Sequence, residues 1–218
     1  MKPAARQRRR PQPSRLTRDD WLDAAFAAVV EGGFDKVRVL VLADKLKVTR
    51  GSFYWHFDEH AELVAALLAR WREREMALRA SLESASTSDP QADLERLLDA
   101  ALAHAGADLE NMRFELALRG LGRRDLDVAK MLIEVDQQRM ALFESKFLRL
   151  TGDPKTAAEQ ATLFYLAIVG GNQALSRPLG PPRLKDYLKA IITSYLVQRH
   201  AAPAPARRRA AVKRSAGR

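Results

Sequence analysis

Four side chains with hydrogen-bonding groups crowd into the short stretch of residues 49–57. They carry a guanidinium, a hydroxyl, a phenol and an imidazole, on Arg50, Ser52, Tyr54 and His56. Arginine can pair with guanine, and hydroxyl and ring groups can reach phosphates, so such a surface suits a groove of DNA. The stretch therefore predicts an element that reads DNA.

Neighbouring apolar residues predict the two short helices that hold this element. Residues 42–46 place apolar side chains at i, i+1 and i+4, on one face of a helix that ends near Lys47. Thr49 then offers its hydroxyl as a cap for a second helix, on which Phe53 and Phe57 are four residues apart and face inward. The two helices are predicted to form a helix-turn-helix. A plain helical bundle would explain the two phenylalanines but not the polar residues beside them.

Residues 48–63 read VTRGSFYWHFDEHAEL, with consecutive ring residues before the next helix. A predicted helix over 21–31 and a glycine break at 32–34 precede them. Together these features resemble the tetracycline-repressor (TetR) family of bacterial transcription regulators, over about residues 17–68. The resemblance implies an all-α fold, in which an N-terminal three-helix helix-turn-helix domain precedes a helical ligand-binding and dimerisation domain, with about nine helices in all.

The resemblance also implies which residues contact DNA. They are Arg38, Thr49, Arg50, Gly51, Ser52, Tyr54, Trp55, His56 and His60. Arg50 and Ser52 are expected at base edges, with Gly51 allowing close approach, and the other polar members at phosphates. Trp55 either packs on the sugar-phosphate backbone or covers the edge of the core. His60 stands where the family often has lysine, so its phosphate contact is expected to be weaker.

Two departures from the family pattern concern how the unit is anchored. Lys47 stands in the turn between the two helices, where the family usually has glycine. A lysine there is expected to hold a positive φ, at a cost of ~1 kcal/mol. Val39 and Leu40 open the second helix in place of a polar cap and a polar contact residue, so Lys36 and Arg38 are expected to substitute as phosphate contacts.

The composition favours a helical, intracellular chain. Alanine, leucine and arginine are abundant, which favours helices. No cysteine occurs in the 218 residues, which excludes disulfides and thiolate sites and fits a reducing cytoplasm. No apolar run approaches the ~20 residues of a membrane span, and the basic start leads into polar sequence rather than an apolar signal segment. We expect a cytoplasmic bacterial protein, associated with the nucleoid and without a membrane partner.

The net charge of +10 comes from the two ends of the chain. Of the 37 basic residues, six lie in residues 1–16 and six in residues 201–218, and neither end has an acidic residue. The middle therefore has 25 basic against 27 acidic residues, a net charge of −2. Both ends are predicted to be disordered: 1–16 as a basic arm that either tracks DNA or only solubilises, and 201–218 as a basic tail.

Between these ends we expect a helix-turn-helix DNA-binding domain over 17–60 and an effector-binding and dimerisation domain over 61–200. Helices are expected at about 17–31, 38–47, 49–57, 59–84, 109–119, 125–150, 154–175 and 184–200. A further helix is expected to begin at residue 90. The helix over 154–175 is apolar on most sides, so more than one side must be covered. The resemblance implies that the last two long helices pair with those of a second subunit in a homodimer.

The resemblance further implies a small-molecule effector in the second domain. The candidate lining residues are Trp71, His104, Met112, Phe114, Met140, Phe143, Phe164, Tyr165, Asn172 and Gln173. Methionine and aromatic residues at helical spacing are also what a core requires. Asn172 and Gln173 are amides in an apolar helix and need partners, either in a pocket or across a dimer seam. No ligand class follows from these residues.

The predicted function is a dimeric repressor that binds double-stranded DNA and leaves an inverted-repeat operator when the effector binds. Three alternatives stay open: an activator, an architectural protein that coats DNA through its basic ends, and a helical enzyme or binding protein with a vestigial DNA head. The four histidines lie on separate elements, and no HExxH, GxSxG or glycine-rich phosphate loop occurs. We expect no enzymatic activity, no metal and no cofactor.

Overall fold

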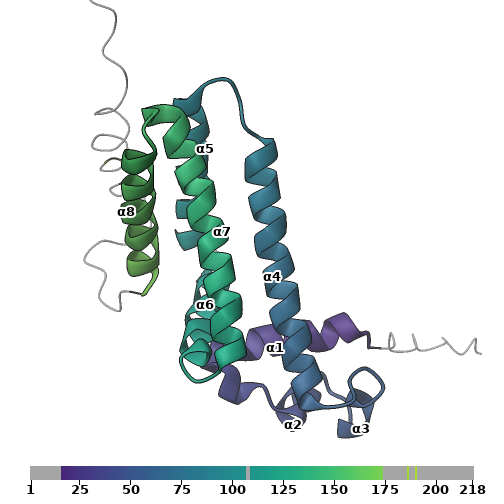
Figure 1. Ribbon diagram of the computed structural model, residues 1–218. Coiled ribbons are helices and arrows are strands. Elements are labelled where there is room, and N and C mark those ends of the chain that lie inside the picture. Colours follow the sequence, from purple (N-terminus) through teal and green to yellow (C-terminus); the bar gives the residue numbers. More distant parts are fainter. Residues whose placement is uncertain (1–15, 107–108, 174–185, 187–189, 191–218) are drawn as a thin grey trace, which may run out of the picture. The chain divides into compact units, whose positions relative to one another are not determined.

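The computed structural model describes residues 16–106, 109–173, 186 and 190 (Figure 1). Within these residues the chain forms eight α-helices, one 3-10 turn and no β-strand, which confirms the all-α fold class. The elements are α1 (Arg18–Gly32), η1 (Phe34–Lys36), α2 (Val39–Lys45), α3 (Arg50–Phe53), α4 (His60–Ser84), α5 (Pro90–Gly106), α6 (Leu109–Gly122), α7 (Leu126–Thr151) and α8 (Pro154–Gln173). Of the last helix predicted, over 184–200, only the helical residues Asp186 and Ala190 are described. The predicted basic arm, apart from Leu16, and the basic tail lie outside the described residues.

The helices form two compact units, each described by itself. The first contains residues 16–81 and 109–136, and the second contains residues 82–106 and 137–173. The first unit holds α1, α2, α3 and α6, most of α4 and the beginning of α7, whereas the second holds α5, α8 and the rest of α7. None of the described helices combines the length and the apolar character needed to cross a membrane.

The first helix begins with a capping box formed by Thr17 and Asp20. The Thr17 hydroxyl accepts a hydrogen bond of 3.3 Å from the N–H of Asp20, and the Asp20 carboxylate accepts one of 2.7 Å from the N–H of Thr17. These two residues thereby satisfy donors that a helix start leaves unpaired. The helix ends at Gly32, and Gly33 takes a φ of +81°, in the left-handed region that favours glycine.

Aromatic side chains fill the core of the first unit. Phe53 meets Trp21 edge-on at 5.3 Å between ring centroids and stacks on Phe57 at 5.4 Å. All three rings are buried, so the inward orientation predicted for Phe53 and Phe57 is confirmed. Phe114 of α6 stacks on Phe26 of α1 at 5.0 Å, which joins the two helices. The helix-turn-helix is thereby fixed to a larger core than its own three helices supply.

The second unit has a separate apolar core. It is built from α5, α7 and α8, with Leu94, Leu97, Leu142, Phe143, Phe147, Ala157, Ala161, Phe164 and Tyr165 as its buried members. Phe143 meets Phe164 edge-on at 4.8 Å, which locks α7 against α8. The Asp89 carboxylate caps the start of α5, since it accepts hydrogen bonds from the N–H groups of Gln91 and Ala92.

Three local expectations are wrong. The helix expected over 49–57 is shorter, because α3 ends at Phe53 and residues 54–56 form a turn. The Thr49 hydroxyl makes no capping bond; the first turn is closed instead by the main-chain carbonyl of Thr49, which accepts from the N–H of Ser52 at 3.0 Å. The helix expected over about 109–119 is longer, since α6 continues to Gly122.

Candidate nucleic-acid interface

The turn between α2 and α3 orients the predicted reading element. Lys47 has a φ of +58°, so the left-handed conformation expected of this lysine is confirmed. Its N–H donates to the carbonyl of Asp44 at 3.1 Å, and the N–H of Val48 donates to that of Ala43 at 2.9 Å. These bonds close the end of α2 and direct the chain into α3.

The surface of α3 and of the turn after it displays most of the side chains predicted to contact DNA. Trp55 is 83% exposed and Tyr54 is 48% exposed. Arg50 and Gly51 are exposed as well, and Ser52 and His56 are half-buried. At this exposure the Trp55 indole does not cover the edge of the core, which leaves its ring face open to a nucleic-acid backbone.

Arg50 and Tyr54 form a pair on this surface. The Arg50 guanidinium donates a hydrogen bond of 2.9 Å to the Tyr54 hydroxyl, and it lies 5.7 Å from the centre of the Tyr54 ring. The pair is one helical turn apart, with Arg50 on α3 and Tyr54 just beyond its end. An arginine restrained in this way loses less side-chain entropy when it meets a ligand.

Arg18 anchors the turn from outside the helix-turn-helix. It donates 2.9 Å hydrogen bonds to the main-chain carbonyl of His56 and to the carboxylate of Glu62. Its guanidinium also lies 4.3 Å from the centre of the Phe57 ring. Sequence reasoning missed this residue, because no local spacing connects α1 with a turn 38 residues later.

Two predicted phosphate contacts already hold main-chain carbonyls. The Nε2 atom of His60 lies 2.5 Å from the carbonyl oxygen of Val37, and the Nε of Arg38 donates to the carbonyl of Asp35 at 3.0 Å. The terminal nitrogens of Arg38 make no hydrogen bond within the described part of the chain, whereas His60 has only one further ring nitrogen to offer. Both contacts stay predictions.

The effector-lining residues predicted from the sequence are divided between the two units, and their role stays a prediction. Trp71 and Phe114 are buried in the core of the first unit. The buried core of the second unit contains Phe143, Phe164 and Tyr165, with Met140 packed against it. Met112 is buried. The side chains of His104, Asn172 and Gln173 lie outside what the structure describes.

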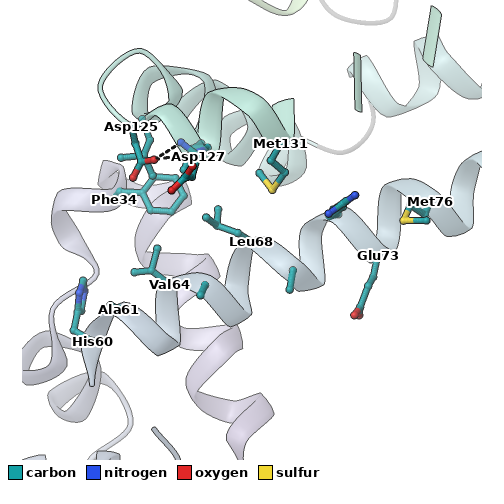
Figure 2. Close-up of a pocket in the computed structure, with 15 residues that line it drawn as sticks. Phe34, His60, Ala61, Val64, Leu68, Glu73, Met76, Asp125, Asp127 and Met131 are labelled. Carbon is teal, nitrogen blue, oxygen red and sulfur yellow. Dashed lines mark hydrogen bonds between the residues drawn. The ribbon is translucent and has the colours of Figure 1, made fainter. Parts of the chain in front are cut away.

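A groove of about 950 Å³ runs along α4 in the first unit (Figure 2). It is lined by Phe34, His60, Ala61, Val64, Ala65, Leu68, Ala69, Arg72, Glu73, Met76, Leu121, Asp125, Asp127, Val128 and Met131. The lining is mainly apolar, with Asp125 and Asp127 at its α7 side. None of the effector residues predicted from the sequence lines it, because its members come from four separate segments that share no single helical stripe.

An exposed arginine, hydroxyl and two aromatic rings on a short helix and turn, held by a buried aromatic core, define a helix-turn-helix protein. Residues 22–67 match the model of a family described as bacterial regulatory proteins, tetR family. This segment of the chain is therefore similar to the family, in agreement with the resemblance at residues 48–63.

Two curated relatives come from Pseudomonas putida. The chain is 35% identical over 91 residues to the HTH-type transcriptional regulator TtgR of this organism, and equally to its probable HTH-type transcriptional regulator ArpR. The matched segment is 42% of this chain and 43% of each relative, so it spans less than half of their length.

Solved structures share the fold over a longer part of the chain. A transcriptional regulator from Saccharomonospora viridis, in complex with choline, has a TM-score of 0.69 at 17% identity, over 83% of this chain and 97% of that one. A regulator from Rhodococcus sp. Rha1 has a TM-score of 0.68 at 19% identity, over 87% and 100% of the two chains. At these identities the likeness extends to the fold alone.

Proposed function

We propose that the protein is a DNA-binding transcriptional regulator, a dimeric repressor that leaves an inverted-repeat operator when a small molecule binds. The observation that carries the proposal is the surface of exposed Arg50, Tyr54 and Trp55 beside half-buried Ser52. Buried Phe53 fixes this element from behind. The match of residues 22–67 to the tetR family, with transcriptional regulators as relatives, supports the same assignment. These relatives are regulators rather than enzymes.

In this proposal α3 enters the major groove. Arg50 pairs with a guanine edge, while the Tyr54 hydroxyl and the Trp55 indole lie against the sugar-phosphate backbone. The 2.9 Å bond from Arg50 to Tyr54 holds the guanidinium ready for a base before DNA arrives. Base and backbone contacts therefore come from one coupled pair.

A second copy of the chain doubles the recognition surface. On α8, Leu163 and Leu166 are each more than half exposed, which supports a helix that another subunit covers. Two subunits related by a two-fold axis place two copies of α3 on half-sites about one helical turn, or a multiple of it, apart.

The groove along α4 is our proposed effector site. It begins at His60, only three residues beyond the buried Phe57 that supports the reading element. The helix α4 can take different placements in the dimer, and a ligand can bind one placement more tightly than another. Such a ligand changes the fraction of dimers whose two α3 helices are spaced to reach both half-sites. The regulator from Saccharomonospora viridis was solved with choline, so choline is a reasonable first compound to test.

DNA reading is tested by fluorescence anisotropy with a labelled site selected from random DNA, against a scrambled site, at two salt concentrations. Arg50→Ala is expected to lose about 1–3 kcal/mol on the selected site and to relax specificity at one base pair. Tyr54→Phe is expected to weaken binding to both DNAs, and more on the selected site, because Arg50 also loses the hydroxyl that holds it. Lys130→Ala, at an exposed position on α7, is the control. Unchanged affinity in both Arg50→Ala and Tyr54→Phe would show that α3 is not the reading element.

The same titration separates a repressor from an architectural protein. A chain lacking residues 1–15 and 201–218 loses twelve basic residues and is expected to keep its preference for the selected site. Loss of nearly all binding, with equal and steep salt dependence on both DNAs, would favour coating through the basic ends instead.

The effector site is tested by filling the groove. Ala65→Trp places an indole at an exposed position of the lining and is expected to keep DNA affinity while removing the response to the effector. Ala80→Trp, elsewhere on α4, is the matched control and is expected to respond normally. An effector response that survives in Ala65→Trp would place the site outside this groove.

A further inference from the structure

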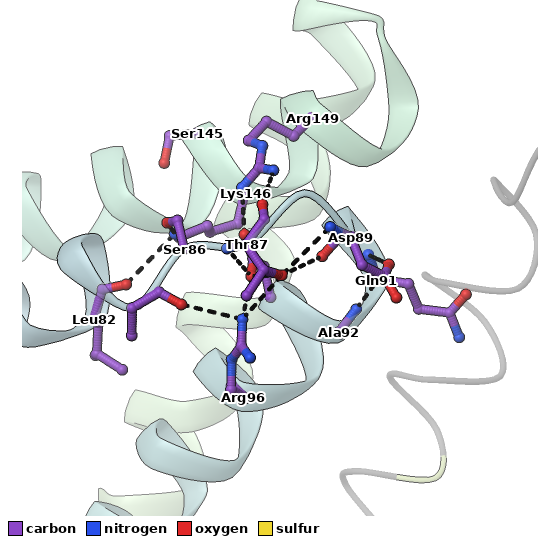
Figure 3. Close-up of polar contacts among 12 residues, drawn as sticks. Leu82, Ser86, Thr87, Asp89, Gln91, Ala92, Arg96, Ser145, Lys146 and Arg149 are labelled. Atoms are coloured by element: carbon purple, nitrogen blue, oxygen red, sulfur yellow. Dashed lines mark hydrogen bonds and ion pairs between the residues drawn. The ribbon is translucent and has the colours of Figure 1, made fainter.

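The loop between α4 and α5 is surrounded by three cations and one buried carboxylate (Figure 3). Asp93 of α5 is almost completely buried and pairs with Arg96 of α5 and with Arg149 of α7. It also accepts hydrogen bonds from the N–H of Thr87 at 2.7 Å and from the Thr87 hydroxyl at 2.8 Å. The acceptor capacity of Asp93 is therefore used by four donors.

The third cation, Lys146, has no carboxylate partner within the described residues. Only 5% of Lys146 is exposed. Its ammonium donates to the hydroxyl of Ser86 and, at 3.5 Å, to the carbonyl of Leu82. Both acceptors are neutral. A buried ammonium held only by neutral groups is unfavourable unless a further anion compensates it.

We propose that Ser86 is a phosphorylation site and that this cluster receives its phosphoryl group. A protein kinase would transfer the γ-phosphoryl group of a nucleoside triphosphate to the Ser86 oxygen. A bond forms between that oxygen and phosphorus, the bond to the nucleoside diphosphate breaks, and the hydroxyl proton leaves to the kinase or to solvent. Ser86 is an exposed residue in a loop, where a kinase can reach it.

One cation contacts the oxygen to be modified, and a second contacts the main chain beside it. Lys146 already contacts the Ser86 hydroxyl, and Arg96 donates to the carbonyl of the preceding residue, Ala85, at 3.1 Å. All hydrogen bonds of the Arg96 guanidinium use Nη2, so its Nε and Nη1 have no partner within the described residues. A phosphoserine adds a charge of about −1.5 to −2 and three acceptor oxygens, which these donors can use.

The neighbouring hydroxyls do not fit the same chemistry. The Thr87 hydroxyl donates to Asp93, so a phosphoryl group there would meet a buried carboxylate. Ser88 contacts none of the three cations within the described residues. Ser88 is therefore a matched control: it lies in the same exposed loop, two residues from Ser86.

The test uses the full-length chain with phosphoserine incorporated genetically at position 86 or at position 88. Phosphoserine at 86 is expected to raise Tm by about 3–6 °C, because new charge-assisted bonds join the end of α4 to α7. Phosphoserine at 88 is expected to leave Tm within about 1 °C of that of the unmodified chain. No gain at 86, or the same gain at 88, overturns the proposal.

Two substitutions test whether Lys146 and Arg96 cause the rise in Tm that phosphoserine at position 86 is expected to produce. Lys146→Met is expected to remove the gain from phosphoserine at 86. In case this buried substitution prevents folding, Arg96→Gln at a half-exposed position is expected to reduce the gain. A gain that is unchanged in Arg96→Gln, and in Lys146→Met if it folds, contradicts the assignment of these cations.

Binding of a free anion is distinguished from phosphorylation of Ser86 by adding inorganic phosphate to the unmodified chain. Chloride at equal ionic strength is the reference. Inorganic phosphate could raise Tm only when Lys146 is present, while phosphoserine at position 86 gives no gain in Tm. This result would show a site for free anions and would overturn the proposal that Ser86 is phosphorylated. Phosphopeptide mapping of the chain from its own cells is expected to find phosphate on Ser86. Phosphate on Thr87 or Ser88 alone, or on none of them, would contradict it.

Discussion

The guanidinium of Arg18, at the first position of α1, donates a 2.9 Å hydrogen bond to the main-chain carbonyl of His56, in the turn after α3. This bond joins the start of the first helix to the segment that displays Tyr54 and Trp55. The same guanidinium lies over the Phe57 ring and pairs with Glu62. One side chain therefore joins the end of the exposed turn to the start of α4.

Arg18→Met should loosen this turn while keeping the apolar part of the side chain. We expect a loss of about 1 kcal/mol in the free energy of unfolding, a small value because the Arg18 side chain is nearly half exposed. This corresponds to a fall in Tm of about 2–4 °C, measured by circular dichroism. Affinity for the selected DNA should fall as well, since the turn no longer holds its position.

Lys130→Met is the control for this prediction. Lys130 pairs with Asp127 at 3.1 Å, but both side chains are largely exposed. Its loss is expected to change stability by less than about 0.5 kcal/mol and to leave DNA affinity unchanged. Equal effects of the two substitutions would show that Arg18 has no special role.

Lys47→Gly should stabilise the protein. Lys47 holds a φ of +58°, a conformation that costs a residue with a Cβ about 1 kcal/mol and costs glycine little. Its ion pair with Asp44, 3.6 Å long and exposed, contributes little. Because glycine also loses more entropy on folding, we expect a net gain of about 0.5 kcal/mol, measured by urea unfolding.

Lys47→Ala separates the backbone effect from the loss of charge. Alanine keeps the strain of the left-handed conformation, so its stability should stay within about 0.5 kcal/mol of that of the unmodified chain. A gain in Lys47→Ala as large as that in Lys47→Gly would attribute the effect to the lysine side chain instead.

Trp55 should report DNA binding by its own fluorescence. Trp21 and Trp71 are buried, whereas Trp55 is 83% exposed. Acrylamide is therefore expected to quench mainly Trp55, and Trp55→Phe should remove most of the quenchable emission. Selected DNA should protect the indole from acrylamide in the unmodified chain. Equal quenching with and without bound DNA would place Trp55 outside the interface.

Asp93→Asn should make the stability of the protein less sensitive to acid. Burial alone raises the pKa of the Asp93 carboxyl, but the hydrogen bonds from Thr87 and the ion pair with Arg149 outweigh it and hold this pKa well below its ordinary value of 3.8. The unfolded chain then binds the proton more tightly than the folded one. The charged Asp93 carboxylate therefore contributes fully to the free energy of unfolding at pH values above 3.8. This contribution is lost progressively as the pH falls below 3.8.

The expected measurement is Tm against pH for both chains. At pH 6, Asp93→Asn should be clearly less stable than the unmodified chain, because Arg149 loses a charged partner. The difference should narrow between pH 4 and pH 2.5, where the unmodified chain loses the same contribution. A difference that stays constant over this range would mean that the Asp93 carboxylate is not the group responsible.

Features that depend on neighbours within about four residues could be predicted from the sequence. The capping box of Thr17 and Asp20 and the burial of Phe53 and Phe57 follow from local spacing, whereas the left-handed conformation of Lys47 was implied by the family resemblance at this turn. Helix periodicity is local in the same sense, which is why most helix positions agree with the structure. The family signature also lies in one continuous stretch, residues 48–63.

What only the tertiary structure decided involves residues far apart in the chain. Arg18 meets His56 across 38 residues, and Arg149 meets Asp93 across 56. The groove along α4 likewise collects residues from Phe34 to Met131. Such contacts arise because packed helices bring distant side chains together, and each contact is decided by the competition among all possible partners. No spacing along the sequence encodes that competition.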